Sequence, residues 1–350
     1  MNIKDIAALA GVSSATVSRY LNHGYVSAAN REKLRAIIEE HQYQPSSMAQ
    51  TLRTKKTMKI GVILPRIDSA TISRIVEGIS LSLRGLGYHL LLANTYNDTA
   101  EELRYLRLFR ENQVDGIIFI ATLWSRKHQQ LVKACKVPVV LLGQQNPTFS
   151  CIYHADGRAA YEATKAIVNA ARKIGYIGVT QSDQAVGQER RTGFYRAIQE
   201  EQQVRVGLAD ADAALTATDI EVGFSMEDGY KGAKQLLSQN PQLDSLVCAT
   251  DTIAIGAMRY LKEVGVSIPV QIQVIGLGDS PVGDLLSPRL STVHFSYKTS
   301  GIEAGKLLLE AMQDEQGISG GGPHKAICLD TSLLLKESTR QGMVERTKYD

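Results

Sequence analysis

Residues 3–22 hold the pattern that most constrains this chain, the stretch IKDIAALAGVSSATVSRYLN. Apolar side chains recur there at the spacing of one helix face, at Ile3, Ile6, Leu9 and Ala10. Gly11 predicts a left-handed helix end, and Ser13 or Ser14 is expected to cap a second helix that holds Val17. The stretch therefore predicts two short helices joined by a tight turn.

The spacing of Ala7, Gly11 and Val17 has a steric explanation. Ala7 lets two helices cross closely, Gly11 adopts the left-handed turn, and Val17 fills the gap between the helices. This pattern is typical of a helix-turn-helix, although an ordinary amphipathic helix pair would show the same three positions. Residues 27–41 predict a third helix with Leu34 on its inner face.

Longer strings decide between these alternatives. The segments AGVSSATVSRYLN, VSAANREKL and YQPSSMAQTL resemble the N-terminus of the lactose-repressor (LacI/GalR) family of transcription regulators. The resemblance continues through the rest of the chain. It implies a sequence-specific regulator, expected to be a repressor, that binds a palindromic double-stranded operator as a homodimer and responds to a small sugar or sugar-phosphate effector.

Base reading falls, by this resemblance, to three positions on the exposed face of the second helix: Ser14, Ala15 and Arg19. Arg19 suits a bidentate contact to guanine, whereas Ser14 and Ala15 favour a hydroxyl contact or a thymine methyl. A contact to phosphate alone is the alternative for Arg19. The positions expected to contact phosphate are Thr16, Ser18 and Asn22.

Residues 46–53 carry a weak helical pattern that is too short to be stable alone in water. By resemblance to the family this segment is a hinge helix, and Ala49 and Leu52 contact DNA. Paired leucines from two subunits would push into the minor groove at the operator centre and kink the duplex. We expect Leu52 to be this wedge, with local packing as the alternative.

Charge is distributed unevenly along the chain. Residues 1–57 contain eight Lys and Arg against four Asp and Glu, whereas the remainder contains 31 against 32. A small basic segment joined to a neutral body fits binding to a phosphate backbone. Charge alone also fits a solvated basic surface.

The hydrophobic pattern changes after Met58 to a series of nearly continuous apolar strands that alternate with helices, typical of a doubly wound parallel α/β fold. Strands are predicted at residues 59–65, 88–94, 114–121, 137–143, 173–180, 217–221, 245–250, 270–278, 291–297 and 326–335. Helices are predicted at residues 73–87, 100–112, 126–136, 156–173, 191–202, 228–239, 253–265 and 300–313.

The two successive α/β series predict a two-lobed core like that of periplasmic binding proteins. The expected parts are a helix-turn-helix headpiece at 1–44, a hinge at 45–57, an effector-binding and dimerisation domain at 58–340 and a tail at 341–350. Within the core, the first lobe is expected at about 58–155 and 296–324, and the second at about 156–291 and 325–340.

Ligands of open α/β sheets bind beyond the carboxyl ends of the strands, so we expect a small molecule between the lobes. The resemblance places effector contacts at Asp68, Ser69, Arg190, Phe224, Thr250 and Asp251. Packing or capping is the alternative for each, and for Asp251 it is the N-cap of a helix. Relatives commonly carry an aspartate at the position of Gly278, so either the usual acceptor is missing here or Asp279 replaces it from the next position.

Several functional classes are excluded or disfavoured. The seven histidines show no spacing typical of a catalytic or metal site, and the four cysteines form no CxxC pair, so we expect no enzyme, metal or cofactor. Without an apolar run long enough for a membrane span or signal peptide, a cytoplasmic protein is expected. The alternative, a sugar receptor of the periplasmic type, would lack residues 3–53. VDGIIFIAT, VGQERRTGF and TVHFSYKTSG resemble repressors of sucrose or related glycoside operons.

Overall fold

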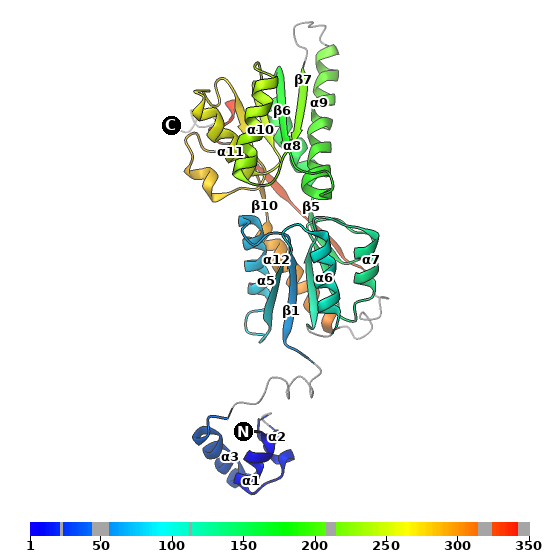
Figure 1. The fold of residues 1–350 in the computed structure, drawn as a ribbon, viewed down its shortest axis with the longest axis vertical. Helices are drawn as coiled ribbons and strands as arrows, with labels where there is room; N and C mark the ends of the chain where they lie inside the picture. The colour runs from blue at the N-terminus through cyan, green and yellow to red at the C-terminus, as the bar shows by residue number, and fades with distance from the viewer. Residues whose placement is uncertain (22–23, 44–55, 112–113, 208–214, 314–323, 342–350) are drawn as a thin grey trace. The chain divides into compact units, whose positions relative to one another are not determined.

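The computed structural model divides into two compact units, Met1–Lys59 and Ile60–Asp350 (Figure 1). The described residues are 1–21, 24–43, 56–111, 114–207, 215–313 and 324–341. Three predicted DNA contacts, Asn22, Ala49 and Leu52, lie outside these ranges, as does the whole predicted hinge helix at 46–53. Each unit is therefore described by itself.

The described part of the first unit is a bundle of α1 (Ile3–Ala10), α2 (Ser14–Leu21) and α3 (Ala28–Glu40). Asn2 caps α1, and Gly11 ends it in the left-handed conformation with φ 64°. The Thr16 amide donates to the Ser13 hydroxyl at 3.2 Å, so Ser13 caps the second helix. The buried core is formed by Ile6, Ala7, Ala10, Val17, Val26 and Leu34.

The prediction that Leu9 faces this core is wrong, because its side chain is 55% exposed. The apolar face of α1 runs through Ile3, Ile6, Ala7 and Ala10 at spacings of three and four residues. Leu9 lies roughly 110° away from the centre of that stripe at the usual 100° per residue. Ala7 is buried, as its predicted role in close helix crossing requires.

The second unit begins with a six-stranded sheet of order β11-β5-β4-β3-β1-β2. Its strands are β1 (Lys59–Leu64), β2 (His89–Asn94), β3 (Gly116–Ile120), β4 (Val139–Leu142), β5 (Cys151–His154) and β11 (Ala326–Leu329). Two helices pack on each face. One face is covered by α5 (Ala70–Ser82) and α12 (Tyr297–Gln313), and the other by α6 (Thr99–Arg110) and α7 (Arg126–Lys133). We call this layered body the first lobe.

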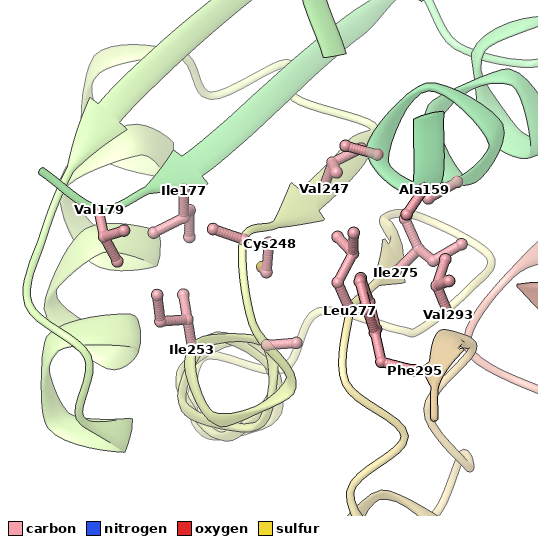
Figure 2. Close-up of a cluster of buried hydrophobic side chains, with 14 of the residues drawn as sticks. Ala159, Ile177, Val179, Val247, Cys248, Ile253, Ile275, Leu277, Val293 and Phe295 are labelled. Atoms are coloured by element: carbon pink, nitrogen blue, oxygen red, sulfur yellow. The ribbon is translucent and has the colours of Figure 1, made fainter. Parts of the chain in front are cut away.

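The second lobe is built on a parallel sheet of order β7-β6-β8-β9. Its strands are β6 (Lys173–Gly178), β7 (Thr216–Glu221), β8 (Ser245–Cys248) and β9 (Gln273–Ile275). The helices packed on it are α8 (Asp156–Val168), α9 (Arg190–Gly207), α10 (Met226–Gln239) and α11 (Asp251–Glu263). Figure 2 shows part of the buried core, where Ile177 and Cys248 from the strands lie near Ile253 from α11.

The chain passes three times between the lobes within the described residues. It crosses at Ala155 after β5, at Ser296 after β10 (Thr292–Phe295) and at Asp330 before β12 (Thr331–Leu334). Strands β10 and β12 pair antiparallel, so two of the crossing segments are joined by backbone hydrogen bonds. Three adjacent crossings form the kind of hinge about which two lobes can close.

Two features of this core differ from the sequence predictions. Strand β5 is not predicted, because four residues after a turn-rich segment give too short a pattern. The predicted strand 326–335 is divided at Asp330 into β11 and β12. Because β11 pairs with β5, the assignment of residues 325–340 to the second lobe is wrong for that strand: parallel pairing extends the first sheet instead.

Candidate functional site

The second helix of the first unit presents the predicted DNA contacts that the structure describes. Ala15 and Arg19 are exposed and lie one helical turn apart, while Val17 points into the core. Ser14, Thr16 and Ser18 are partly exposed, and the Thr16 hydroxyl lies 3.0 Å from that of Ser13. This face combines a cation with short side chains, as base contacts in a major groove require.

A row of polar residues follows the apolar strands of the first sheet at their carboxyl ends. Leu64, Ile120, Leu142 and Ile152 are buried neighbours on one face of this sheet. Two positions further along the chain stand Arg66, Thr122, Gln144 and His154. His154 ends β5, whereas the other three follow the ends of β1, β3 and β4. We call them the polar row.

A cavity between the lobes begins at this row. It is lined from the first lobe by Arg66, Ser69, Arg74 and Thr122 among others. The second lobe contributes Asp183, Arg190, Phe224, Thr250, Asp251 and Ser280. The cavity therefore has a basic wall on the first lobe, and the second lobe contributes its carboxylates. Five of the seven predicted effector contacts line it: Ser69, Arg190, Phe224, Thr250 and Asp251.

Arg190 is the most constrained of these side chains. Its Nε donates to Asp156 at 2.7 Å, Nη1 donates to the Ala249 carbonyl at 2.6 Å, and Nη2 lies 3.5 Å from the Tyr297 hydroxyl. Burial lowers the pKa of Arg190, but the charges and hydrogen bonds of Asp156 and Tyr297 together outweigh it, so the pKa lies above its usual value. Most donors of the guanidinium are thus used within the protein, and the residue holds the cavity wall together.

Phe224 gives the cavity an aromatic face. The guanidinium of Arg66 lies 4.9 Å from the centre of its ring, a cation–π contact between residues of different lobes. Phe224 follows β7, and Ser69 precedes α5, so each side chain enters the cavity from the end of a regular element. A flat ligand face has one apolar surface here on which to stack.

Asp251 and Thr250 have separate roles at the start of α11. Thr250 is the N-cap, since its side chain accepts from the Ile253 amide, so the alternative that made Asp251 the cap is wrong. The Asp251 carboxylate accepts from the Thr292 hydroxyl at 2.6 Å and from the Ser280 amide at 2.7 Å. Burial raises the pKa of Asp251 to about 6.

Asp183 is a buried carboxylate of the cavity that the sequence analysis missed. It begins the π-helical turn η1 (Gln184–Glu189) and accepts from the Val186 amide at 2.9 Å. Burial raises the pKa of Asp183 to about 6. Its sequence signal is weak, because an aspartate in a loop is most often a surface or capping residue.

These shifts predict a pH dependence of stability that Asp183→Asn tests. A carboxyl with a raised pKa holds more protons in the folded than in the unfolded chain between about pH 4 and 6, so its contribution to stability is lost as the pH rises through that window. The asparagine side chain of the variant does not titrate, so the variant has no such loss of stability. We expect the variant to gain about 2 kcal/mol relative to wild type between pH 4.5 and 7. Urea unfolding at both pH values measures it, and an equal difference at both would contradict the burial argument.

Two predicted effector contacts do not line the cavity. Asp68 is exposed. The Asp279 carboxylate points elsewhere, because it accepts from His294 Nδ1 at 2.8 Å and lies 3.6 Å from Lys336 Nζ. Its expected role as a substitute acceptor is therefore not supported by the geometry, which instead ties Asp279 to the strand pair β10–β12.

The glycine at position 278, where the family resemblance predicts an aspartate, also has a structural explanation. Gly278 has φ 145°, a conformation that side chains rarely adopt. A Cβ built there would lie 3.7 Å from the carboxyl carbon of Asp251. An aspartate at this position would thus combine backbone strain with repulsion between two carboxylates.

Two searches of the described residues bear on other functions. None of the helices in those ranges is both long and apolar enough to cross a membrane. No group of three His, Cys, Asp or Glu side chains there is placed to hold a metal ion.

Comparison with known proteins covers both units. Residues 2–46 match the family of bacterial regulatory proteins of the lacI type, and residues 57–319 match the family of periplasmic binding proteins and the sugar binding domain of the LacI family. The sucrose operon repressor of Staphylococcus xylosus is 33% identical over 315 residues, which cover 90% of this chain and 94% of the repressor. The transcriptional repressor PurR of Vibrio atlanticus is 30% identical over 321 residues, covering 89% and 92%.

A solved structure with the same fold is the lac repressor dimer bound to operator and the anti-inducer ONPF. It has a TM-score of 0.82 at 23% identity, and the match covers 97% of this chain and 99% of that one. Three findings support the same family assignment. Helix α2 has an exposed face suited to DNA, a cavity lies between two lobes, and the family models match both units. The chain belongs to the LacI family of bacterial transcription regulators.

Proposed function

We propose that this regulator represses a carbohydrate-utilisation operon and that a sugar in the cavity between the lobes modulates its affinity for the operator. The observation that carries the proposal is the pairing of a helix-turn-helix unit with a cavity lined from both lobes. A sugar receptor of the periplasmic type does not bind DNA and would not need the helix-turn-helix of the first unit. The match of residues 2–46 to regulatory proteins supports the regulator over that receptor.

A homodimer on palindromic DNA fits the size of the reading surface. Helix α2 has eight residues, so one copy reaches only a few base pairs. Two copies related by a two-fold axis would double the contacts and read a palindromic operator. The related lac repressor was solved as a dimer bound to operator, which supports the same assembly here. Operator binding implies a cytoplasmic location.

The chemistry of the cavity supports a sugar. A sugar ring presents an apolar C–H face and an edge of hydroxyls, which the Phe224 ring and the carboxylates of Asp183 and Asp251 complement. We propose Ser69, Arg190 and Thr250 as further cavity contacts, with Arg190 acting mainly on the shape of the wall. The sucrose operon repressor of S. xylosus supports sucrose or a related glucoside or fructoside as the effector.

The volume of the cavity bears on how the sugar enters. It measures about 140 Å³, below the range of about 300–1,000 Å³ that is usual for small-molecule sites. We therefore expect the lobes to part about the three crossings near Ala155, Ser296 and Asp330 as a ligand enters. A ligand that binds one lobe arrangement more tightly would shift the population toward it.

Calorimetry with a panel of ligands tests the effector class. The panel contains sucrose, glucose, fructose, their phosphates, and the purines hypoxanthine and guanine. We expect saturable binding of at least one sugar, weakened more than tenfold by Phe224→Ala and unchanged by Tyr25→Ala, which removes an exposed aromatic ring from the other unit. Tight binding of a purine and of none of the sugars would refute the sugar assignment.

A further inference from the structure

Two arginines of the first lobe contact the second lobe beside the cavity between them. Arg66 follows β1, and its guanidinium lies 4.9 Å from the centre of the Phe224 ring. Arg74 lies in α5, and its Nη2 donates a hydrogen bond to the main-chain carbonyl of Asp279. Both arginines line the cavity, as does Phe224. The two contacts join the lobes directly through protein groups.

These two contacts lie at opposite edges of the second sheet. Its strand order is β7-β6-β8-β9, so β7 and β9 are the outer strands. Phe224 follows β7, whereas Asp279 follows β9. Two contacts at separate points resist twisting of one lobe against the other as well as parting, which a single contact would not do.

The acceptor for Arg74 is held in place by the second lobe. Asp279 has φ 50°, a left-handed conformation that is uncommon outside glycine. Its amide donates to the Thr292 hydroxyl at 3.2 Å, and its carboxylate accepts from His294 Nδ1 at 2.8 Å. These bonds fix the loop to β10, so the Asp279 carbonyl is a preformed acceptor for a side chain of the first lobe.

The contact of Arg66 lies far from two of the crossing segments. The crossings at Ala155 and Asp330 follow β5 and β11, which are neighbours at one edge of the first sheet. Arg66 follows β1, which is separated from β5 by β3 and β4. Strand spacings of about 4.8 Å place it roughly 14 Å from β5. Rotation about these crossings moves a distant group more than one beside them, so a contact at Arg66 opposes opening effectively.

Charge strengthens the attraction of Arg66 to the second lobe. Asp228, in the first turn of α10, has a pKa below its usual value, chiefly because Ser225 donates hydrogen bonds to its carboxylate. The positive charge of Arg66 is a smaller cause of the same shift. Arg66 is therefore attracted by a carboxylate of the second lobe as well as by the Phe224 ring.

The size of the cavity fits lobes that are held together. At about 140 Å³ it is smaller than most small-molecule sites. We propose that Arg66 and Arg74 form a clasp that holds the two lobes closed over the cavity, and that a ligand enters only when both contacts part. The clasp is a property of the lobes alone. In the proposed regulator, its strength sets the fraction of open molecules that can take up the effector.

Double electron–electron resonance on the full-length chain without added sugar tests the clasp. Spin labels are attached through azide-bearing residues introduced at Ser80 on α5 and Gln235 on α10, which are exposed positions on different lobes. An excess of unlabelled chain limits the measurement to label pairs within one chain of the homodimer. We expect wild type to show mainly one distance. The double variant Arg66→Met, Arg74→Met should raise the ratio of open to closed molecules about tenfold or more.

Two controls separate the clasp from general effects of charge and loop structure. Arg84→Met removes an exposed arginine of the first lobe that does not line the cavity, so it should keep the distance distribution of wild type. Asp279→Asn should keep it too, since Arg74 donates to the main-chain carbonyl rather than to the carboxylate. Because Arg66 and Arg74 are partly exposed, the double variant should keep the far-ultraviolet circular dichroism of wild type, which confirms folding.

Three results would overturn the clasp. They are one and the same distance distribution in wild type and the double variant, an equal shift with Arg84→Met, or a shift with Asp279→Asn as large as that of the double variant. Because no sugar is added, each of these results leaves the proposed effector site intact, which the calorimetry of Phe224→Ala tests separately.

Discussion

Replacing Arg190 with methionine is expected to lower the free energy of unfolding of the second unit by about 3–5 kcal/mol, because one partner of a buried ion pair is removed. Arg190 is 3% exposed and Asp156 6%, so the variant would leave a carboxylate buried without its cation. The Ala249 carbonyl would also lose the hydrogen bond that it accepts from Nη1. Urea denaturation of wild type and variant at pH 7 measures the loss.

The double variant Asp156→Leu, Arg190→Met is the matched control. Replacing both charges by apolar groups of similar volume is often neutral, so we expect it to recover at least half of the lost stability. A loss below about 1 kcal/mol in the single variant, or no recovery in the double variant, would contradict the account of this ion pair. Loss of effector binding in Arg190→Met alone would therefore not identify a direct ligand contact.

Arg19→Ala is expected to cost about 1–3 kcal/mol of operator binding and to relax preference at one base pair, since an exposed arginine on α2 is placed to reach a base edge. Lys56→Ala is the control, because a lysine outside the reading helix should weaken binding to all DNA similarly and lower the salt slope. Fluorescence anisotropy with a selected operator and a scrambled duplex across a salt series distinguishes the effects of the two variants. Equal losses on both duplexes for Arg19→Ala would contradict base reading.

Periodic features of the sequence predict most of the fold. The three helices of the first unit and the alternation of strands and helices after Met58 follow from apolar spacing, which regular elements impose on any sequence that buries one face. Strand β5 escapes this reasoning because four residues are too few to show a period. The pairing of β11 with β5 is also not predicted, because it joins segments that are more than 170 residues apart in the chain.

The ligand cavity is predicted only in part, because its contacts depend on tertiary geometry. Arg190 and Phe224 were found through a resemblance to a family, and both line the cavity. The resemblance does not predict that the Arg190 guanidinium donates to Asp156 or that the Asp279 carboxylate accepts from His294. Asp183 carries no periodic signal, since it is a single polar residue in a loop before η1.

The most direct test of the account is the affinity for a selected operator, measured by anisotropy with and without a saturating concentration of the sugar that binds in calorimetry. Coupling between the two units through the lobes predicts a change of about fivefold or more in wild type. The same sugar should change the affinity of Phe224→Ala less than twofold, since the aromatic face of the cavity is lost. An operator affinity that the sugar leaves unchanged in wild type, or changes equally in both proteins, would contradict the central claim.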